Sequence, residues 1–437
     1  MSSPPLQAAG KSARPTRLRF LVAGMLCAAA VVAYLGRSGL GVAEGKVSSE
    51  LGLDEVRMGW AMSAFFWGYA VAQIPAGWIG QLIGPRTALA IYATVWAACC
   101  AAIGGSFNLT LLIATQFAFG VAQAGVFPCA AQAISVWVPN SWRGISTGLL
   151  GSSMSVGAAA SSQLAGVVLE VCSWRLMFVL FAIPSVVWAI IFYWVFRDRP
   201  DDHPAVNDAE LAVISDDNPK KPVDNERQTW DWLAYLASFD LWMVNGQQFF
   251  RAAGYVFYTT WFPKYLKEMH GVSTLQSGLL ASLPLLAVVV GSTSGGFIVD
   301  AIWKRTQSAR LSRQAVGVCA MLGCASCISL AYFVHGKYGA VAMIAAGSFC
   351  AAVAGPCAYT ITIDKAGKAV APVFGIMNMS GNIGAALCPT AVGYFVAEYG
   401  WSWLLLPFAG IYVVAAFCWL LLNPQGEFRS PKPKQAA

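Results

Sequence analysis

The sequence predicts an all-α membrane protein in which twelve transmembrane helices form two six-helix bundles related by pseudo-two-fold symmetry. The first observation is composition, because 57% of the 437 residues are apolar and only 11% are charged. An average globular domain has about 25% charged residues. The second is that apolar runs of about 20 residues, long enough for a membrane helix, recur along the whole chain. The third is a loop motif that occurs once in each half, as expected of an internal repeat.

The predicted spans fall into two sets of six. The first set lies at 18–43, 58–80, 86–105, 110–138, 144–169 and 174–196. The second set lies at 236–263, 277–300, 314–334, 338–363, 370–396 and 401–422. The run 110–138 is longer than one crossing, so its helix is expected to continue beyond the bilayer. The chain therefore divides into a tail (1–17), a first bundle (18–196), a linker (197–235), a second bundle (236–422) and a tail (423–437).

Basic residues are distributed unevenly between the two sides of these spans. Of the 28 Lys and Arg residues, 20 lie in the termini and even-numbered loops, 6 lie in the odd-numbered loops, and the other two are Arg37 and Arg251. The positive-inside rule places both termini and the linker in the cytoplasm. Topology thus explains the net charge of +7, and no nucleic-acid partner is expected. We expect a multi-pass protein of a bacterial cytoplasmic (inner) membrane.

Arg37 lies well inside the first predicted span, where a charge is expensive. A guanidinium keeps its proton, and an Arg at the centre of a membrane helix costs at least about 2.5–3.5 kcal/mol. Such a residue either snorkels to the nearer interface or faces a watery cavity or an anionic partner. The cavity is favoured, because a second buried Arg occurs later in the chain.

Glu44 follows Arg37 by seven residues, two helical turns on and near the same face. It is expected just after the first span, at the start of a short outer loop. Three interpretations stay open: a partner of the Arg37 region, a protonatable group, or a solvated helix end.

The loop after the second span carries the first recognisable motif. Gly77, Gly84 and Arg86 have the spacing Gly-x6-Gly-x-Arg. The pattern resembles the signature loop between spans two and three of the major facilitator superfamily, although Gln81 and Leu82 replace the usual acidic and basic residues. The second half repeats the motif and keeps the acid, with Asp300, Lys304 and Arg305. The resemblance implies the twelve-helix fold of that superfamily and a role in gating for these loop residues.

Other stretches resemble the anion:cation symporter branch of the superfamily, which includes bacterial hexuronate, galactonate and glucarate carriers and vesicular and lysosomal organic-anion carriers. The matching stretches lie at 37–43, 63–69, 142–148, 197–204, 260–266, 363–364 and 375–384. The branch places hydroxyl-binding groups at the positions of Tyr34, Tyr69, Gln248 and Asn378. The resemblance therefore implies a small anionic, polyhydroxylated substrate.

Two acidic residues of proton-coupled relatives are missing here. Such carriers commonly have an Asp where this chain has Gly36, and an Arg and a Glu where it has Gln116 and Gln123. A Gln can hydrogen-bond a substrate hydroxyl but cannot carry a proton, so Gln116 and Gln123 are candidate substrate contacts. The departure favours exchange or uniport over ordinary proton symport.

Span seven brings the second buried charge. Gln248, Arg251 and Tyr255 are spaced i, i+3 and i+7, on one helical face. The branch has an apolar residue where Arg251 stands, whereas organophosphate:phosphate exchangers use paired arginines on spans one and seven. The two arginines favour a substrate of higher charge, such as a diacid or a phosphate or sulfonate ester.

The remaining polar signals are weaker. Asn378 and Asn382 lie four apart on span eleven, and either join helices or contact substrate hydroxyls. The pair Cys324-x-x-Cys327 lacks a second such pair or a His cluster, so the 12 Cys are interpreted as packing residues and no metal or cofactor is expected. No set of catalytic side chains suggests an enzyme.

The sequence thus predicts a monomeric secondary transporter for a small organic anion, a sugar acid or related carboxylate, working by alternating access. Arg37 and Arg251 would supply charge. Three alternatives remain: a proton-coupled sugar-acid symporter using Glu44, an organophosphate or sulfonate exchanger, and an anion sensor that transports nothing.

Overall fold

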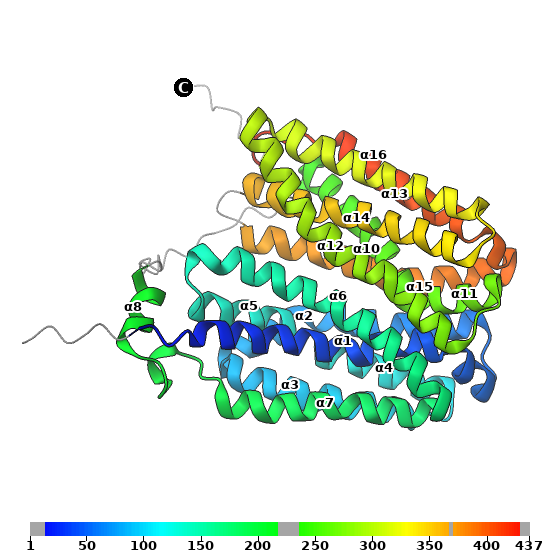
Figure 1. Ribbon diagram of the computed structural model, residues 1–437, viewed down its shortest axis with the longest axis horizontal. Helices are drawn as coiled ribbons and strands as arrows, with labels where there is room; N and C mark the ends of the chain where they lie inside the picture. The colour runs from blue at the N-terminus through cyan, green and yellow to red at the C-terminus, as the bar shows by residue number, and fades with distance from the viewer. Residues whose placement is uncertain (1–13, 217–235, 367–369, 429–437) are drawn as a thin grey trace, which may run out of the picture.

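The computed structural model describes residues 14–216, 236–366 and 370–428, and these are helical apart from short connections, with no strand among them. The helices form two groups that lie side by side, α1–α7 and α10–α16 (Figure 1). Helix α1 begins and helix α16 ends at the same end of the molecule (Figure 1), which we call the termini side. Helix α11 lies at the opposite end, the far side (Figure 1).

The first group follows the chain as a succession of long helices. Its members are α1 (Leu18–Leu51), α2 (Glu55–Ile83), α3 (Pro85–Gly104), α4 (Leu109–Gln123), α5 (Val126–Trp137), α6 (Asn140–Val171) and α7 (Trp174–Val195). The linker then contributes a short 3-10 turn, η1 (Pro200–Asp202), and helix α8 (Asp208–Asp216) on the termini side.

The second group repeats the pattern. Its members are α10 (Phe239–Thr260), α11 (Phe262–His270), α12 (Thr274–Thr306), the π-helical turn η2 (Arg310–Ala315), α13 (Val316–Phe333), α14 (Lys337–Ala366), α15 (Val370–Tyr399), η4 (Trp401–Trp403) and α16 (Leu405–Leu421). In the described part of the chain, nine helical segments are long and apolar enough to cross a membrane. Helices α2, α10 and α15 belong to the same two groups without being among the nine, so a count of twelve crossings stays a prediction.

Helix α1 is longer than the first predicted span, which ended at residue 43. It continues to Leu51 and stops where Gly52 takes a left-handed conformation, with φ of 63°, and donates its backbone N–H to the Ser48 carbonyl. Within the added turns the Ser48 hydroxyl donates to the Glu44 carboxylate, 2.8 Å away. Glu44 therefore lies inside a helix and not in a loop as expected.

The predicted run 110–138 is one span with a break in it. Helix α4 ends at Gln123 and α5 begins at Val126. Pro128 lacks the N–H that would bond to the carbonyl four residues earlier, and this interrupts the helix. Gly125 fits at the break because a Cβ there would lie 2.1 Å from the ring of Tyr92.

The two groups touch closely on the far side, where glycines let the backbones approach. A Cβ on Gly41 would lie 2.5 Å from the carbonyl oxygens of Thr259 and Thr260 in α10. A Cβ on Gly278 of α12 would lie 2.3 Å from the Ser162 carbonyl of α6. Small residues at such contacts are typical of membrane helix packing.

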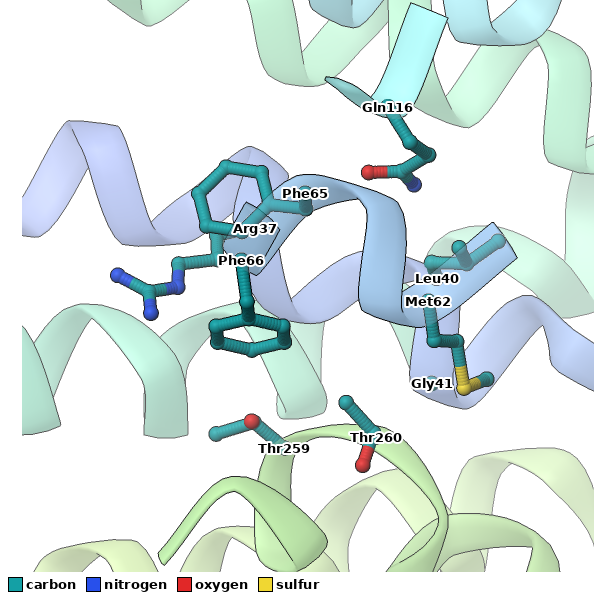
Figure 2. A pocket seen from close by; sticks show the side chains of 9 residues that line it. All are labelled: Arg37, Leu40, Gly41, Met62, Phe65, Phe66, Gln116, Thr259 and Thr260. Atoms are coloured by element: carbon teal, nitrogen blue, oxygen red, sulfur yellow. The ribbon is translucent and has the colours of Figure 1, made fainter. Parts of the chain in front are cut away.

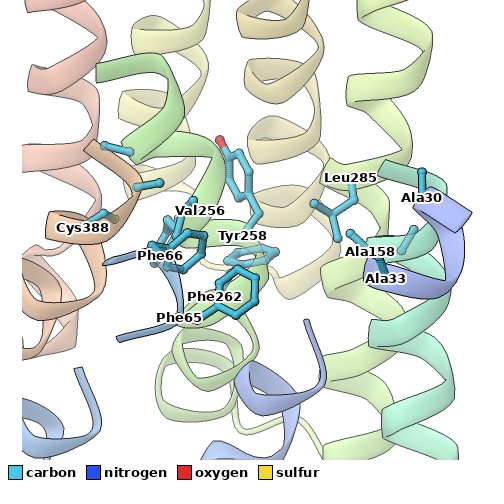
Figure 3. Packing of buried hydrophobic residues seen from close by; sticks show 14 of the residues in the cluster. Ala30, Ala33, Phe65, Phe66, Ala158, Val256, Tyr258, Phe262, Leu285 and Cys388 are labelled. Carbon is cyan, nitrogen blue, oxygen red and sulfur yellow. The ribbon is translucent and has the colours of Figure 1, made fainter. Parts of the chain in front are cut away.

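Apolar side chains from both groups join in one buried cluster. Figure 3 shows Phe65 and Phe66 of α2 beside Val256 of α10 and Phe262 of α11. It also shows Ala30, Ala33 and Ala158 of the first group beside Leu285 of α12. Where these side chains meet, the interface between the two groups is a packed apolar core. Polar residues that face the interface must therefore lie outside this core.

Candidate functional site

Arg37 lies in a cage of four aromatic rings. Its guanidinium carbon is 4.7 Å from the ring centres of Tyr34 and Phe65, 4.8 Å from Phe66 and 5.4 Å from Tyr69. Tyr34 precedes Arg37 by one helical turn on α1, and the other three rings stand on adjoining turns of α2. The faces of aromatic rings attract cations, so the cage stabilises the charge without a carboxylate.

The hydrogen-bonding capacity of Arg37 is only partly used. Its Nη1 donates to the Tyr34 hydroxyl, 3.0 Å away, and no other hydrogen bond or ion pair is formed with the described residues. The side chain is half-buried, and none of its nitrogens is among the buried polar atoms that lack a partner. The remaining N–H groups of Arg37 are therefore not fully buried, and they make no hydrogen bond with a described residue.

Arg251 is held differently, by an amide oxygen. Its Nη2 and Nε donate to Oε1 of Gln248, at 2.8 and 3.3 Å, one helical turn earlier on α10. Gln248 and Arg251 thus lie on one face of α10, as their spacing predicts. Nη1 makes no hydrogen bond with a described residue and lies 3.7 Å from where a Cβ on Gly355 would be. Arg251 is half-buried and, like Arg37, forms no ion pair within the described chain.

Tyr255 of α10 reaches from the second group toward the first. Its hydroxyl lies within electrostatic range of both guanidinium groups and of Tyr34. It also makes a long hydrogen bond, 3.4 Å, to the hydroxyl of Ser155 on α6, in the first group. Tyr255, one helical turn after Arg251 on α10, therefore approaches α6 across the interface.

A small cavity lies between Arg37 and the far side. It measures about 10 Å³ and is lined by Arg37, Leu40, Gly41, Met62, Phe65, Phe66, Gln116, Thr259 and Thr260 (Figure 2). A cavity of roughly 10–15 Å³ holds about one water molecule. Figure 2 shows the Arg37 guanidinium pointing away from Thr259, Thr260 and Gln116. This space is too small for a sugar acid.

The two glutamines of α4 differ in their surroundings. Gln116 is buried and lines the small cavity. Gln123 is 2% exposed and donates its amide N–H to the backbone carbonyl of Ala33, 2.8 Å away, one turn before Arg37 on α1. Gln123 thus joins α4 to α1, and one N–H of its amide is used within the first group.

The asparagines of α15 also differ. Asn382 donates to the side-chain oxygen of Gln73 on α2, 2.9 Å away, and so links the two groups. Asn378 is half-buried, one turn earlier on α15. Among the described residues no hydrogen bond joins Asn378 to either arginine, and its substrate contact stays a prediction.

The position before Arg37 has no room for a side chain. A Cβ on Gly36 would lie 2.9 Å from the sulfur of Cys100 and 3.0 Å from the ring of Phe119. The glycine therefore faces the tightly packed interior of the first group. An acidic residue at this position would displace both neighbours.

Glu44 forms part of an ion-pair bridge between the groups. Nζ of Lys264 on α11 lies 2.8 Å from the Glu44 carboxylate and 3.2 Å from that of Glu55 on α2. Glu44 is 1% exposed, so the interpretation as a solvated helix end is wrong. Burial opposes the charge of Lys264, but the two carboxylates outweigh it and raise the pKa of Lys264. We call these three residues the Lys264 bridge; it lies on the far side, two turns beyond Arg37.

A further lysine stands beside this bridge. Burial lowers the pKa of Lys267, and the neighbouring Lys46 and Lys264 act in the same direction, opposed by Glu44 and Glu268. The contact zone of α1 and α11 is therefore rich in charge, in contrast to the core around it.

The signature loop of the first half is fastened to the end of α7. Gly84 has φ of 81°, and a Cβ there would lie 2.6 Å from the Asp198 carboxylate. The backbone N–H of Arg86 donates to Asp198, 2.8 Å away, and its Nε donates to the Tyr193 carbonyl, 2.9 Å away. Gly77 packs on Pro128. These contacts explain the motif residues locally, and their role in gating stays a prediction.

The equivalent loop of the second half is more open. Asp300, Lys304 and Arg305 are all exposed. Nearby, Arg313 forms an ion pair with Asp364. Both loops lie on the termini side, far from the Lys264 bridge (Figure 1). They do not belong to the group of residues around Arg37 and Arg251.

The 12 Cys are free thiols. In the described ranges no three His, Cys, Asp or Glu side chains gather as a possible metal site.

Sequence reasoning missed several residues that the structure places at the interface. Phe65 and Phe66 read as ordinary apolar residues, and only their spacing to Tyr69 hinted at a common face. Ser155 and Gln73 carried no signal, because uncharged polar residues occur in many of the apolar runs of this chain. Lys264 did carry a sequence signal. It is a basic residue directly after a long apolar run, in one of the odd-numbered loops, which are poor in basic residues.

Comparisons with known proteins fit these features. The family model described as Major Facilitator Superfamily matches residues 26–309 and 302–437. The chain is 29% identical over 420 residues to a probable sulfoacetate transporter of Cupriavidus necator, covering 96% of this chain and 97% of the relative. It is also 29% identical over 424 residues to a probable galactarate/D-glucarate transporter of Bacillus subtilis, covering 94% and 92%.

Solved structures show the same architecture. A bacterial homologue of the human lysosomal transporter Spinster, in an inward-facing and unoccupied conformation, superposes with a TM-score of 0.73. The alignment covers 93% of this chain and 95% of that one at 15% identity. At this identity the likeness shows a shared fold and nothing about the substrate.

Proposed function

Because the chain belongs to the Major Facilitator Superfamily, we propose that it is a secondary transporter that carries a small organic anion by alternating access. The substrate class is a sugar acid or a related carboxylate or sulfonate. One observation carries the proposal: Arg37, a permanent cation in the middle of a long apolar helix, is caged by aromatic rings and has free N–H groups at the interface. The relatives named for sulfoacetate and for galactarate or D-glucarate support the same class, since these substrates are all anions.

The aromatic cage suits an anion site for a physical reason. Rings stabilise a guanidinium on its faces and leave its edge free. An edge with two N–H groups can bind a carboxylate or sulfonate through two parallel, charge-assisted hydrogen bonds. In this proposal Arg37 binds the anion, while Tyr34 and Tyr69 supply hydroxyl groups beside it. Gln116 and Asn378 are further proposed contacts of the substrate. Gln123 acts indirectly in this proposal, by holding α1 in position.

The coupling we propose is exchange or uniport. A proton carrier near Arg37 needs a side chain that titrates, and Gly36 has no space for one beside Cys100 and Phe119. Gln123 donates a hydrogen bond to the Ala33 carbonyl, a contact that a carboxylate makes only while protonated. Gly36 and Gln123 thus support a carrier in which substrate transport is not coupled to proton transport.

Symport through Glu44 is the second candidate, and the Lys264 bridge speaks against it. Taking up a proton would neutralise Glu44 and weaken its ion pair with Lys264. The bridge lies two turns from Arg37, on the far side of the small cavity. We assign Glu44 to closure of the far side and not to proton coupling.

The proposal includes an orientation. We place the termini side in the cytoplasm and the far side outside, following the distribution of Lys and Arg, in a bacterial inner membrane. The protein would act as a monomer, with the two bundles 18–196 and 236–422 moving about the interface. A sensor that binds the anion without moving it is the remaining alternative, and a transport assay separates the two.

Uptake into proteoliposomes tests the coupling. We expect labelled substrate, with galactarate and sulfoacetate as the first probes, to accumulate when the vesicles contain unlabelled substrate and no pH gradient is present. An imposed pH gradient without internal substrate should not drive accumulation. Accumulation driven by the pH gradient alone would overturn the exchange mechanism and return Glu44 to the coupling role. Binding without any flux would favour the sensor.

A further inference from the structure

We propose that Lys264 and Lys267 of α11 form an entry site on the far side, where a carboxylate or sulfonate group of the transported anion binds before it reaches Arg37. The inference rests on the proposed function, which places the far side outside, and it adds a second site to that function. The two lysines are three residues apart on one helix, so they lie on the same face of α11. Both contact the first group across the interface.

The present partners of the two lysines belong to the first group. Glu44 of α1 lies 2.8 Å from Nζ of Lys264, and Glu55 of α2 lies 3.2 Å from it. Lys267 donates to the backbone carbonyl of Val42 on α1, 3.4 Å away. Alternating access separates the two groups on one side at a time. When the far side opens, both lysines therefore lose these partners together.

Lys264 keeps its position at that moment, because aromatic rings of its own group hold it. Its Nζ lies 5.7 Å from the ring centre of Trp261 and 5.8 Å from that of Trp401 in η4. A cation within about 6 Å of a ring centre is attracted to the face of the ring. Trp261 is buried, and its indole N–H donates to the carbonyl of Pro389 on α15, 2.9 Å away. The second group therefore presents a positioned ammonium group when the far side opens.

The chemistry of an ammonium group determines which ligand it takes. Lys264 is paired with two carboxylates in this structure, so its surroundings already suit the oxygen atoms of an acid. A carboxylate or sulfonate of the substrate offers the same acceptors once Glu44 and Glu55 have moved away. Glu44 keeps a partner on its own helix, because the Ser48 hydroxyl donates to it, 2.8 Å away. An anion that binds Lys264 thus favours the opened conformation over the closed one.

Two variants that both lack the Lys264 bridge separate an entry site from a simple gate. Lys264→Gln removes the lysine, whereas Glu44→Gln combined with Glu55→Gln removes both carboxylates and keeps the lysine. Loss of the bridge favours far-side opening in either variant, which by itself lowers the KM for an anion supplied from outside. Only Lys264→Gln also loses the entry contact, so the comparison of the two variants isolates that contact.

Uptake of labelled galactarate and labelled sulfoacetate by intact cells that produce the full-length protein gives the KM values. We expect the KM to be about 3- to 10-fold higher in Lys264→Gln than in the double glutamate variant, between the effect of a surface ion pair and that of a charged hydrogen bond. Lys264→Arg should stay within about 2-fold of the native KM, because a guanidinium keeps the charge and also stacks on aromatic rings.

Lys267→Gln gives a second measurement that leaves the bridge intact. We expect it to raise the KM about 2- to 5-fold, the effect of one partly exposed charge. Arg57→Gln, which changes an exposed basic residue of the far side, is the control and should keep the native KM. If the double glutamate variant does not reach the membrane, Glu55→Gln alone takes its place, because Glu55 is the more exposed of the two acids.

The outcomes separate this inference from the proposed function. If Lys264→Gln has the same KM as the double glutamate variant, or if Lys267→Gln keeps the native KM, the entry site is wrong, while anion transport and the closing role of the bridge stand. If the native protein takes up neither anion, the proposed function fails together with the inference.

Discussion

At the scale of single residues, Arg37 is surrounded by aromatic rings where a carboxylate partner could have been expected. Four rings surround the guanidinium, and the glycine before it packs against Cys100 and Phe119. The sequence predicted the buried charge and the missing acid, because both are visible as residue types in an apolar run. It could not predict the cage, since Phe65 and Phe66 look like any other membrane phenylalanines until α2 is placed beside α1.

The cage makes a direct prediction. Replacing Phe66 by Leu keeps an apolar side chain but removes one ring from Arg37, so the cation loses about 0.5–2 kcal/mol of stabilisation. Since this contact also holds the guanidinium in position for an anion, we expect the Kd for the transported anion to rise about 2- to 30-fold in Phe66→Leu. The exposed Phe107→Leu is the matched control and should bind as the native protein does. Unchanged affinity in Phe66→Leu would mean that the ring packs beside Arg37 without acting on its charge.

Gly36 makes a second prediction at this scale. A Cβ at Gly36 meets Cys100 and Phe119 at 3.0 Å or less, whereas a Cβ at Gly24 of the same helix meets nothing within 4 Å. Overpacking typically costs about 1–3 kcal/mol, while Gly→Ala in an open helical position gains up to about 1 kcal/mol. Gly36→Ala should therefore lower the Tm of the detergent-purified protein, and Gly24→Ala should keep or raise it. Equal Tm values for the two variants would contradict the tight packing at Gly36.

At the scale of elements, helix ends explain where the sequence succeeded and failed. The existence of the long helices followed from apolar runs, but hydropathy underestimated α1 because its last turns contain Glu44, Lys46 and Glu50. Those charges are compatible with a helix because they find partners, such as Lys264 for Glu44. The break between α4 and α5 was readable in principle from Pro128, yet the surrounding residues are so apolar that one continuous helix was expected.

Helix α8 shows how the linker is attached to α1. The Glu210 carboxylate accepts hydrogen bonds from the backbone N–H groups of Arg17 and Arg19 at the start of α1 and an ion pair from the Arg19 side chain. A carboxylate is favourable at a helix N-terminus, where backbone N–H groups lack partners. We expect Glu210→Gln to lower stability by about 1–3 kcal/mol, measured as a lower Tm, because hydrogen bonds to a charged group are lost.

The control for this variant is Asp208→Asn, an exposed acid in the first turn of α8 that touches neither arginine in the described contacts. It should change the Tm little. A Tm unaltered in Glu210→Gln would show that α8 is not needed to hold the start of α1.

At the scale of the whole molecule, the structure is closed on the far side. Close glycine contacts, the Lys264 bridge and the water-sized cavity all lie there. The fold itself was predictable, because the superfamily pattern runs through the chain. The conformation was not, since it depends on pairs such as Lys264 with Glu44, which are 220 residues apart in sequence.

The Lys264 bridge should control how often the far side opens. Lys264→Met leaves two carboxylates facing each other, so we expect spin labels at 107 and 399, one in each bundle, to show more of the longer distances. Arg57→Met, another far-side basic residue, is the control. Because the pKa of Lys264 is raised, Lys264 is charged at neutral pH, and on the alkaline side the bridge weakens only above the ordinary lysine pKa of about 10.4. Unchanged distances in Lys264→Met would show that packing alone closes this side.

The most direct test of the central claim is counterflow through Arg37. Proteoliposomes loaded with unlabelled galactarate or sulfoacetate are given the labelled anion outside, at equal pH on both sides. The native protein and Arg57→Gln should take up label, whereas Arg37→Gln should lose about 10- to 100-fold in rate at low substrate concentration, the effect of removing a charged hydrogen-bonding group. Equal counterflow by Arg37→Gln and the native protein would contradict the claim that the caged arginine binds the transported anion.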